Sequence, residues 1–207
     1  MNLPTKEEIE SLWDEYHVPE NIREHSRQVA KVAVFLAKKL KEKGIHVDVG
    51  LAERSALLHD IARSANFENP EEHPQATKED ADFWIQLKHK YPDTHHGDIA
   101  ADLLAEKYPE VADVIKAHTI ENEFEGLLES SWEAKLLVYA DFRVLHDKIV
   151  SFEERTEDSI KRHGQFYEEL QERTGKSYRK VIEANVRKVE KEIFEKLDIG
   201  PEEVNRL

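Results

Sequence analysis

The sequence predicts an all-α protein in which a helical bundle is followed by a C-terminal helical extension. Glycine and proline, the residues that most often interrupt helices, occur only 7 times each among 207 residues. Apolar side chains recur at helical spacing along almost the whole chain. No run alternates with a period of two between turn signals, the pattern that is typical of a half-buried strand.

Residues that typically begin a helix indicate where the first three helices start. Thr5 and Glu8 have the spacing of a capping box and precede an apolar stripe that includes Trp13. Pro19 is expected to open a long second helix, because proline fits the first helical turn, where an amide hydrogen has no partner. Asp48 is expected to cap the third helix. The second and third helices should end near Gly44 and Ala62.

Similar signals delimit the middle of the chain, where loops and helices alternate. The expected elements are a loop over residues 66–75, a polar helix to about Lys90, a helix capped by Thr94 and running through Lys107, a helix from Pro109 through Thr119, an acidic loop over 120–130 that contains Gly126, and an apolar helix from Trp132 to about Lys148.

A charged segment begins at Ser151 and predicts two more helices, broken near Gly175. We therefore expect one domain over residues 1–150 and a charged extension over 151–207. The last helix carries an apolar stripe formed by Ile182, Val186, Val189, Ile193 and Leu197. Packing of this stripe on the chain's own core is the favoured interpretation, and a homodimer formed through it is the alternative.

Composition excludes several classes of protein. Lys plus Arg is 30 and Asp plus Glu is 44, which gives a net charge of −14 and argues against binding of long nucleic acids, because these need a basic surface. The absence of cysteine excludes disulfides and thiol nucleophiles. No apolar run approaches the roughly 20 residues of a membrane span, and the N-terminal sequence MNLPTKEEIE is no signal peptide. We expect a cytoplasmic protein without a membrane partner.

Polar residues occupy helix faces that should be buried. His25 lies three residues after Ile22 and four before Val29, so it shares their face. Four further positions show the same pattern, each on a different predicted helix: His59, His96, His118 and Asp141. Asp60 directly follows His59 in the sequence ALLHDIA.

One such histidine is more often a core residue bonded to a backbone carbonyl than a metal ligand. Five inward-facing positions on five helices, with four histidines and two aspartates, favour a shared partner, because each buried polar group left alone costs about 1–3 kcal/mol. Imidazole and carboxylate together suit a divalent transition metal. Neighbouring helix residues point about 100° apart, so His59 and Asp60 can meet one ion only near a helix end or where the carboxylate reaches across.

These residues, in this order, resemble the HD superfamily of metal-dependent phosphohydrolases over residues 20–148. The family pattern is a histidine, a His-Asp pair and a distant aspartate. Here it reads His25 in NIREHSRQVA, His59-Asp60 in ALLHDIAR and Asp141 in LLVYADFRV. The resemblance implies an HD-domain-like helical bundle.

The chain also resembles the subset of the superfamily that has two further histidines and a two-metal site. His96, in HGDIAADLL, and His118, in VIKAHT, match these positions. His95 is the alternative to His96 for the first of these two positions, although its helical face would carry the polar residues Asp98 and Asp102. Ala100 stands where the family usually has glycine.

The resemblance implies roles for these residues. His25, His59, Asp60 and Asp141 would hold a first ion, and His96 and His118 a second, with Asp60 bridging the two. The cofactor would be one or two ions of Mn, Fe, Co, Ni or Zn, with Mg as a further candidate. If one ion binds, the two added histidines would contact the phosphate of the substrate.

Two arginines and a histidine are candidates for substrate contact. Arg63 lies four residues after His59, hence on its face, and is the candidate phosphate clamp, with a surface ion pair as the alternative. His95 and Arg143 are further candidate substrate-binding residues. Arg155 could fold back over the cleft, but it lies in a charge run, and such runs are usually solvated.

The leading functional hypothesis is hydrolysis of a phosphate ester or anhydride in a nucleotide or another small phosphorylated compound. Here Asp60 and Arg63 would be the catalytic residues. A di-iron oxygenase of the HD superfamily and a non-catalytic interaction module with this fold are the alternatives. The sequence contains no GxSxG, P-loop or GxGxxG motif that would support a serine hydrolase or a kinase.

Overall fold

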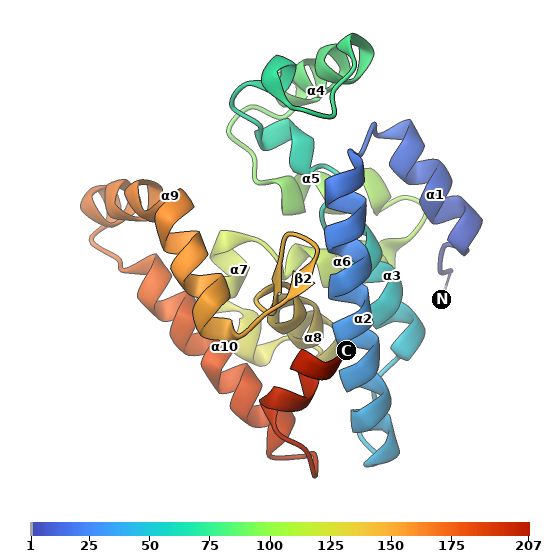
Figure 1. Ribbon diagram of the computed structural model, residues 1–207, viewed down its shortest axis with the longest axis vertical. Coiled ribbons are helices and arrows are strands. Elements are labelled where there is room, and N and C mark those ends of the chain that lie inside the picture. Colours follow the sequence, from blue (N-terminus) through green and yellow to red (C-terminus); the bar gives the residue numbers. More distant parts are fainter. Residues whose placement is uncertain (1) are drawn as a thin grey trace.

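The computed structural model describes residues 2–207, except for the side chains at positions 120 and 121. Helices dominate it, which confirms the predicted all-α class (Figure 1). The helices are α1 (Lys6–Glu15), α2 (Glu20–Glu42), α3 (Val49–Leu58), α4 (Lys78–Lys90), α5 (His96–Leu104), α6 (Pro109–Lys116), α7 (Ile120–Glu125), α8 (Trp132–Asp141), α9 (Phe152–Thr174) and α10 (Tyr178–Phe194). Short 3-10 segments are η1 (Arg63–Asn66), η2 (Pro70–Glu72), η3 (Leu127–Glu129) and η4 (Pro201–Arg206).

Helix α2 is the centre of the bundle. It packs against α3 and α8, and α5 and α6 pack against each other beside α3 (Figure 1). The apolar stripe predicted for α2 faces inward, with Val29, Ala33, Leu36 and Leu40 fully buried. Burial of this face stabilises the bundle by about 25 cal/mol per Å² of apolar surface removed from water.

Several predicted helix ends are confirmed. Thr5 and Glu8 form the capping box of α1, and the Asp48 side chain accepts a hydrogen bond from the amide of Leu51. Gly44 and Gly175 adopt positive φ angles of 79° and 69°, just beyond the ends of α2 and α9. Glycine adopts this conformation without the steric cost that a side chain would add.

Other boundaries differ from the prediction. Helix α5 is capped by His95 rather than Thr94, because the His95 ring accepts the amide hydrogen of Gly97. Helix α3 ends at Leu58, so the chain turns before residue 62. The expected acidic loop over 120–130 instead contains α7 and η3. The cap of α7 is Thr119, whose hydroxyl accepts from the amide of Asn122.

The apolar helix predicted to reach Lys148 ends at Asp141. A hairpin of two short strands, β1 (Val144–Leu145) and β2 (Lys148–Ile149), follows it, and Val144 pairs with Ile149. His146 supplies the turn with a φ of 55°, so neither glycine nor proline marks it in the sequence. The hairpin packs on α2.

The C-terminal helix belongs to the same core as the bundle. Helix α10 packs against α7 and α8, and its stripe is buried within the core, as the favoured interpretation expects. The Asn185 side chain donates to the carbonyl oxygens of Glu123 and Phe124, at 3.1 and 2.9 Å. The domain boundary near residue 150 stays a prediction, but the core continues across it.

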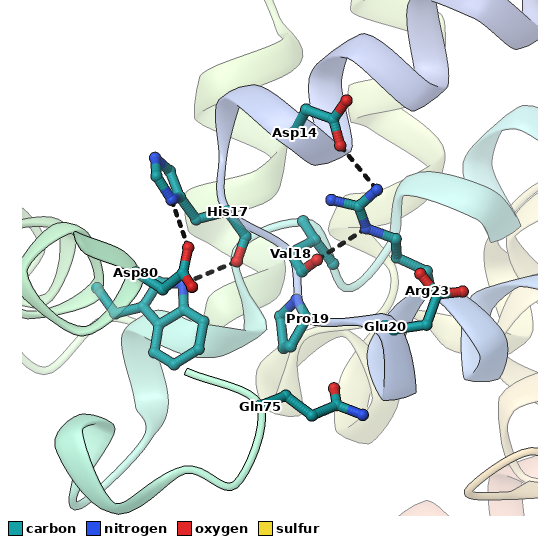
Figure 2. Close-up of a pocket in the computed structure, with 9 residues that line it drawn as sticks. Asp14, His17, Val18, Pro19, Glu20, Arg23, Gln75 and Asp80 are labelled. Carbon is teal, nitrogen blue, oxygen red and sulfur yellow. Dashed lines mark hydrogen bonds and ion pairs between the residues drawn. The ribbon is translucent and has the colours of Figure 1, made fainter. Parts of the chain in front are cut away.

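Residues 63–95 form an arm that leaves the bundle after α3 and returns at α5, with α4 as its longest element (Figure 1). The arm is joined to the α1–α2 connection. His17 Nδ1 lies 2.7 Å from Asp80 Oδ1, and Trp84 donates to the carbonyl of His17 at 2.9 Å (Figure 2). At the base of the arm, Asn66 donates to the carbonyl of Thr94 at 3.0 Å.

Over residues 2–207, none of the helices combines the length and the apolar character needed to cross a bilayer.

Replacement of Ile193 by alanine should lower the free energy of unfolding by about 2–5 kcal/mol, because the side chain is fully buried and its loss leaves a cavity. Chemical denaturation would measure this. Lys191→Ala, on the exposed face of α10, is the control and should change stability by less than about 0.5 kcal/mol. An Ile193→Ala variant as stable as the control would show that α10 is not part of the folding unit.

Candidate metal centre

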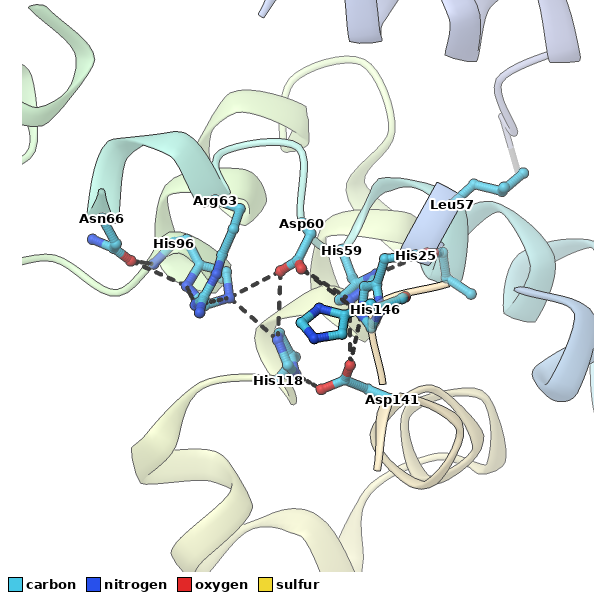
Figure 3. A network of polar contacts seen from close by, with 12 residues as sticks. His25, Leu57, His59, Asp60, Arg63, Asn66, His96, His118, Asp141 and His146 are labelled. Atoms are coloured by element: carbon cyan, nitrogen blue, oxygen red, sulfur yellow. Dashed lines mark hydrogen bonds and ion pairs between the residues drawn. The ribbon is translucent and has the colours of Figure 1, made fainter. Parts of the chain in front are cut away.

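Most of the histidines and aspartates singled out in the sequence lie at helix ends that converge on one point (Figure 3). His59 and Asp60 follow the last residue of α3, and the chain turns there, so both side chains face the same centre. The others are His25 within α2, His96 at the start of α5, His118 after α6 and Asp141 at the end of α8. The structure thus brings all six residues together.

Their ligand atoms form two overlapping groups. In His25, His59 and Asp141, one ligand atom from each residue lies within 4.8 Å of the others, and the same holds for His59, Asp60 and His118. Asp60 and His59 lie where the groups meet (Figure 3). His96 joins through Asp60, since its Nε2 lies 3.0 Å from Asp60 Oδ1 and 3.3 Å from His118 Nε2.

In each of the four imidazoles Nδ1 lies near a polar group outside the cluster, and Nε2 lies near an aspartate. The outside partners of Nδ1 are the carbonyl of His146 for His25 (2.9 Å), the carbonyl of Ala56 for His59 (2.8 Å), Asn66 Oδ1 for His96 (3.0 Å) and Glu123 Oε1 for His118 (3.4 Å). The backbone carbonyl at Nδ1 of His59 fixes the tautomer that leaves the lone pair of its Nε2 free for a metal.

The aspartates are ionised despite their burial. Burial alone would raise the pKa of Asp60, but the imidazoles of His59 and His96 and the charge of Arg63 hold it well below its usual range. Burial acts the same way on Asp141, where the hydrogen bond from His25 and the charge of Arg155 outweigh it and lower the pKa. Two carboxylates therefore carry negative charge inside the bundle.

The histidines differ in charge. Burial lowers the pKa of His59 and, with the charge of Arg63, lowers that of His96 to about 3, so both are neutral. Burial also opposes the charged form of His118, but Glu123 and the two aspartates outweigh it and raise its pKa to about 9. A neutral imidazole is the form that binds a metal.

Buried atoms without a hydrogen-bond partner show that the site suits a cation. Among the described residues, His59 Nε2 and Asp60 Oδ1 are inaccessible to water and make no hydrogen bond. Each such atom costs about 1–3 kcal/mol unless a ligand satisfies it. The nitrogen and oxygen donors match the preferences of Mn, Fe, Co, Ni and Zn. These residues could therefore hold divalent metal ions.

Arg63 and His95 lie beside the centre. Arg63, at the start of η1, has its Nη1 3.0 Å from His96 Nδ1. The ring of His95 lies 4.0 Å from that of His96, between centroids, but its Nδ1 caps α5. Of the two neighbouring histidines, it is His96 whose ring enters the cluster.

Arg143, a predicted substrate-binding residue, makes its hydrogen bonds away from the His/Asp cluster, and its role in substrate binding stays a prediction. Its side chain is 2% exposed and is saturated by hydrogen bonds within the protein. It donates to the carbonyls of Val150 (2.8 Å) and Pro201 (3.2 Å), the hydroxyl of Tyr139 (2.6 Å) and the side chain of Asn205. It joins α8, the hairpin and η4, a role that spacing from Asp141 alone does not predict.

The residues that orient the histidines were missed in the sequence. Asn66 and Glu123 lie in segments expected to be loops, and the partner of His25 is a backbone carbonyl. Asn66 also accepts the amide hydrogen of His96 at 2.9 Å. The signal that could have found Glu123 is weak, because it is one of several acidic residues in its segment.

The fold and the site together define an all-α protein whose buried His/Asp centre is fitted to divalent metals. The family model of the HD domain matches residues 22–199, which is most of the chain, and the chain belongs to the HD domain family. This confirms the resemblance seen in the sequence and places the chain in a superfamily of metal-dependent phosphohydrolases. The match extends through α9 and α10.

Curated relatives include bacterial proteins named Ribonuclease Y. Identity is 33% over 105 residues with that of Latilactobacillus sakei subsp. sakei, 31% over 107 residues with that of Syntrophomonas wolfei subsp. wolfei, and 33% over 107 residues with that of Enterococcus faecalis. Each alignment covers 47% of this chain but only 18% of the relative. The comparison with solved structures gave no significant match.

The variant Glu123→Gln should weaken metal binding by roughly 10–100-fold, because it removes the carboxylate that orients His118 and favours its metal-binding tautomer. Titration of the metal-free protein with Mn or Co would measure the change. Glu125→Gln, two residues away and exposed, is the matched control and should bind metal like the wild type. Equal affinities in both variants would contradict the role of Glu123.

Arg143→Ala should lower the free energy of unfolding by roughly 2–4 kcal/mol, because it leaves buried acceptors unpaired and opens a cavity. The folded variant should still bind metal with wild-type affinity. Denaturation and metal titration on the same preparation would separate the two effects. A stable variant with impaired turnover would instead support a role for Arg143 in substrate binding.

Proposed function

We propose that the chain is a metal-dependent phosphohydrolase that releases phosphate from a nucleotide or another small phosphorylated compound. The observation that carries the proposal is the buried centre itself, where two ionised aspartates and four oriented histidines converge beside an arginine. His25, His59, Asp60 and Asp141 would hold one ion, and His96 and His118 would hold a second, with Asp60 shared. Bound divalent ions supply charge to offset the phosphate and make a water molecule more acidic.

The chain's own residues would bind and orient the reactants. The Arg63 guanidinium lies next to His96 and is close enough to lower the pKa of Asp60, so it faces the position where a phosphate would lie. Guanidinium binds phosphate oxygens through paired hydrogen bonds. Asp60, with its pKa held well below the usual range, would accept a hydrogen bond and orient the attacking water rather than retain a proton.

Size and charge support a small substrate. The side chains of the six candidate ligands are at most 12% exposed, so the reacting phosphate must reach a recessed position. A net charge of −14 opposes the approach of a polyanion except at the centre itself. A terminal phosphate on a compact molecule meets both conditions.

Cleavage of RNA is the second candidate, and the similarity to proteins named Ribonuclease Y favours it. The alignments span less than a fifth of the length of those relatives and about half of this chain, so the resemblance is partial. An RNA substrate would have to present a phosphodiester at the recessed centre against the overall charge.

The variant Asp60→Ala should lower phosphate release by roughly 100-fold or more, because it removes the carboxylate shared between the two candidate ligand groups. Release would be measured from nucleotides, sugar phosphates and a short RNA, each with Mn, Co, Ni, Fe and Mg. Asp113→Ala, on the exposed face of α6, should retain wild-type activity.

The alternatives give different results in the same assay. RNA cleavage that exceeds release from every small compound would favour the ribonuclease function. Unchanged release in Asp60→Ala would contradict the mechanism. Oxygen-dependent turnover by an iron-loaded protein that hydrolyses no phosphate compound would favour the di-iron oxygenase, and a protein that lacks both activities would be an interaction module.

A further inference from the structure

Helix α9 carries a cation to the metal centre. Arg155, in the first turn of α9, has its Nη2 4.0 Å from Asp141 Oδ2, although the sequence favoured a solvated position. Its side chain is 19% exposed. Figure 1 shows α9 leaving the hairpin and extending away from the bundle, and Arg155 lies in the turn of α9 that follows the hairpin.

This guanidinium is poorly satisfied within the protein. At 4.0 Å, the contact with Asp141 is too long for a hydrogen bond. Within the part of the chain that the structure describes, Arg155 Nε is buried and has no hydrogen-bond partner. By contrast, the buried Arg143 is bonded at several atoms. A half-buried guanidinium whose Nε has no acceptor suggests that an acceptor arrives with a ligand.

Arg63 approaches the centre from another element and is similarly available. Its guanidinium contacts the imidazole of His96 and, across the described side chains, lies within ion-pair distance of no carboxylate. Arg63 at His96 and Arg155 at Asp141 thus bring two cations to the centre from different elements, η1 and α9.

We propose that Arg63 and Arg155 bind the same phosphate group from two sides, so that the site selects a terminal phosphate dianion over a phosphodiester. The inference rests on the proposed function, because it names the substrate class of that site. A terminal phosphate has three free oxygens and about two negative charges at neutral pH, enough for two guanidinium groups as well as the centre. A phosphodiester carries one negative charge. Its second ester substituent replaces a free oxygen that one of the two guanidinium groups would bind.

Binding of inorganic phosphate and of dimethyl phosphate to the metal-loaded protein tests this without turnover. Titration calorimetry at about pH 8, where phosphate is a dianion, should show that the wild type binds phosphate more tightly than the diester. Arg155→Ala should weaken phosphate binding by roughly 10–100-fold and remove most of that difference. Arg155→Lys, which keeps the charge but loses the planar fork, should give an intermediate loss.

Two controls separate phosphate binding from a structural role. Arg162→Ala, on the exposed side of the same helix, should bind phosphate like the wild type. Metal content, measured for every variant, should be unchanged in Arg155→Ala. Wild-type phosphate affinity in Arg155→Ala overturns the proposal. Loss of metal in that variant also overturns it, because Arg155 would then act by positioning Asp141.

Phosphate binding and phosphate release together distinguish failure of this inference from failure of the proposed function. A wild type that hydrolyses no phosphate ester but binds phosphate through Arg155 would contradict the function and leave the inference standing. A wild type that releases phosphate, while Arg155→Ala binds phosphate equally well, would do the reverse. Equal affinity of the wild type for phosphate and dimethyl phosphate would overturn the selectivity.

Discussion

The burial of two ionised carboxylates inside a helical bundle is the constraint on which the rest of this structure depends. An isolated carboxylate moved into a protein interior costs many kcal/mol, so Asp60 and Asp141 require compensation from several directions. Helix ends help to supply this compensation. Where the chain turns at the end of a helix, as at His59 and Asp60, successive side chains can face the same point. Five helices therefore converge there, and four of them bring their ligand to the centre at or next to a helix end.

Much of this arrangement could be predicted from the sequence because helical periodicity reports which side of a helix faces inward. His25 and Asp141 share a face with apolar residues, and this pattern alone assigns them to the interior. The pairing of Arg143 with the backbone of the hairpin could not be predicted, because it depends on a turn at His146 that no glycine or proline marks. Periodicity also gives no information about Glu123, whose neighbours are equally acidic.

The C-terminal helices contribute to the centre although they carry none of its predicted metal ligands. Asn185 of α10 holds two carbonyls of α7, and α7 carries the carboxylate that faces His118. Helix α9 brings Arg155 to the other side of Asp141. The segment beyond residue 150, which its charge pattern marks as an appendage, thus supports the centre from outside its first layer of side chains.

Asn66 closes the neck of the arm and orients a ligand at the same time. Its amide nitrogen donates to the carbonyl of Thr94, and its oxygen contacts the backbone and the ring of His96. The two ends of the arm are therefore fastened together at the base, next to the centre, whatever lies between them. The register of the base is therefore held by contacts of Asn66 at the neck, independently of the length of the segment between residues 66 and 94.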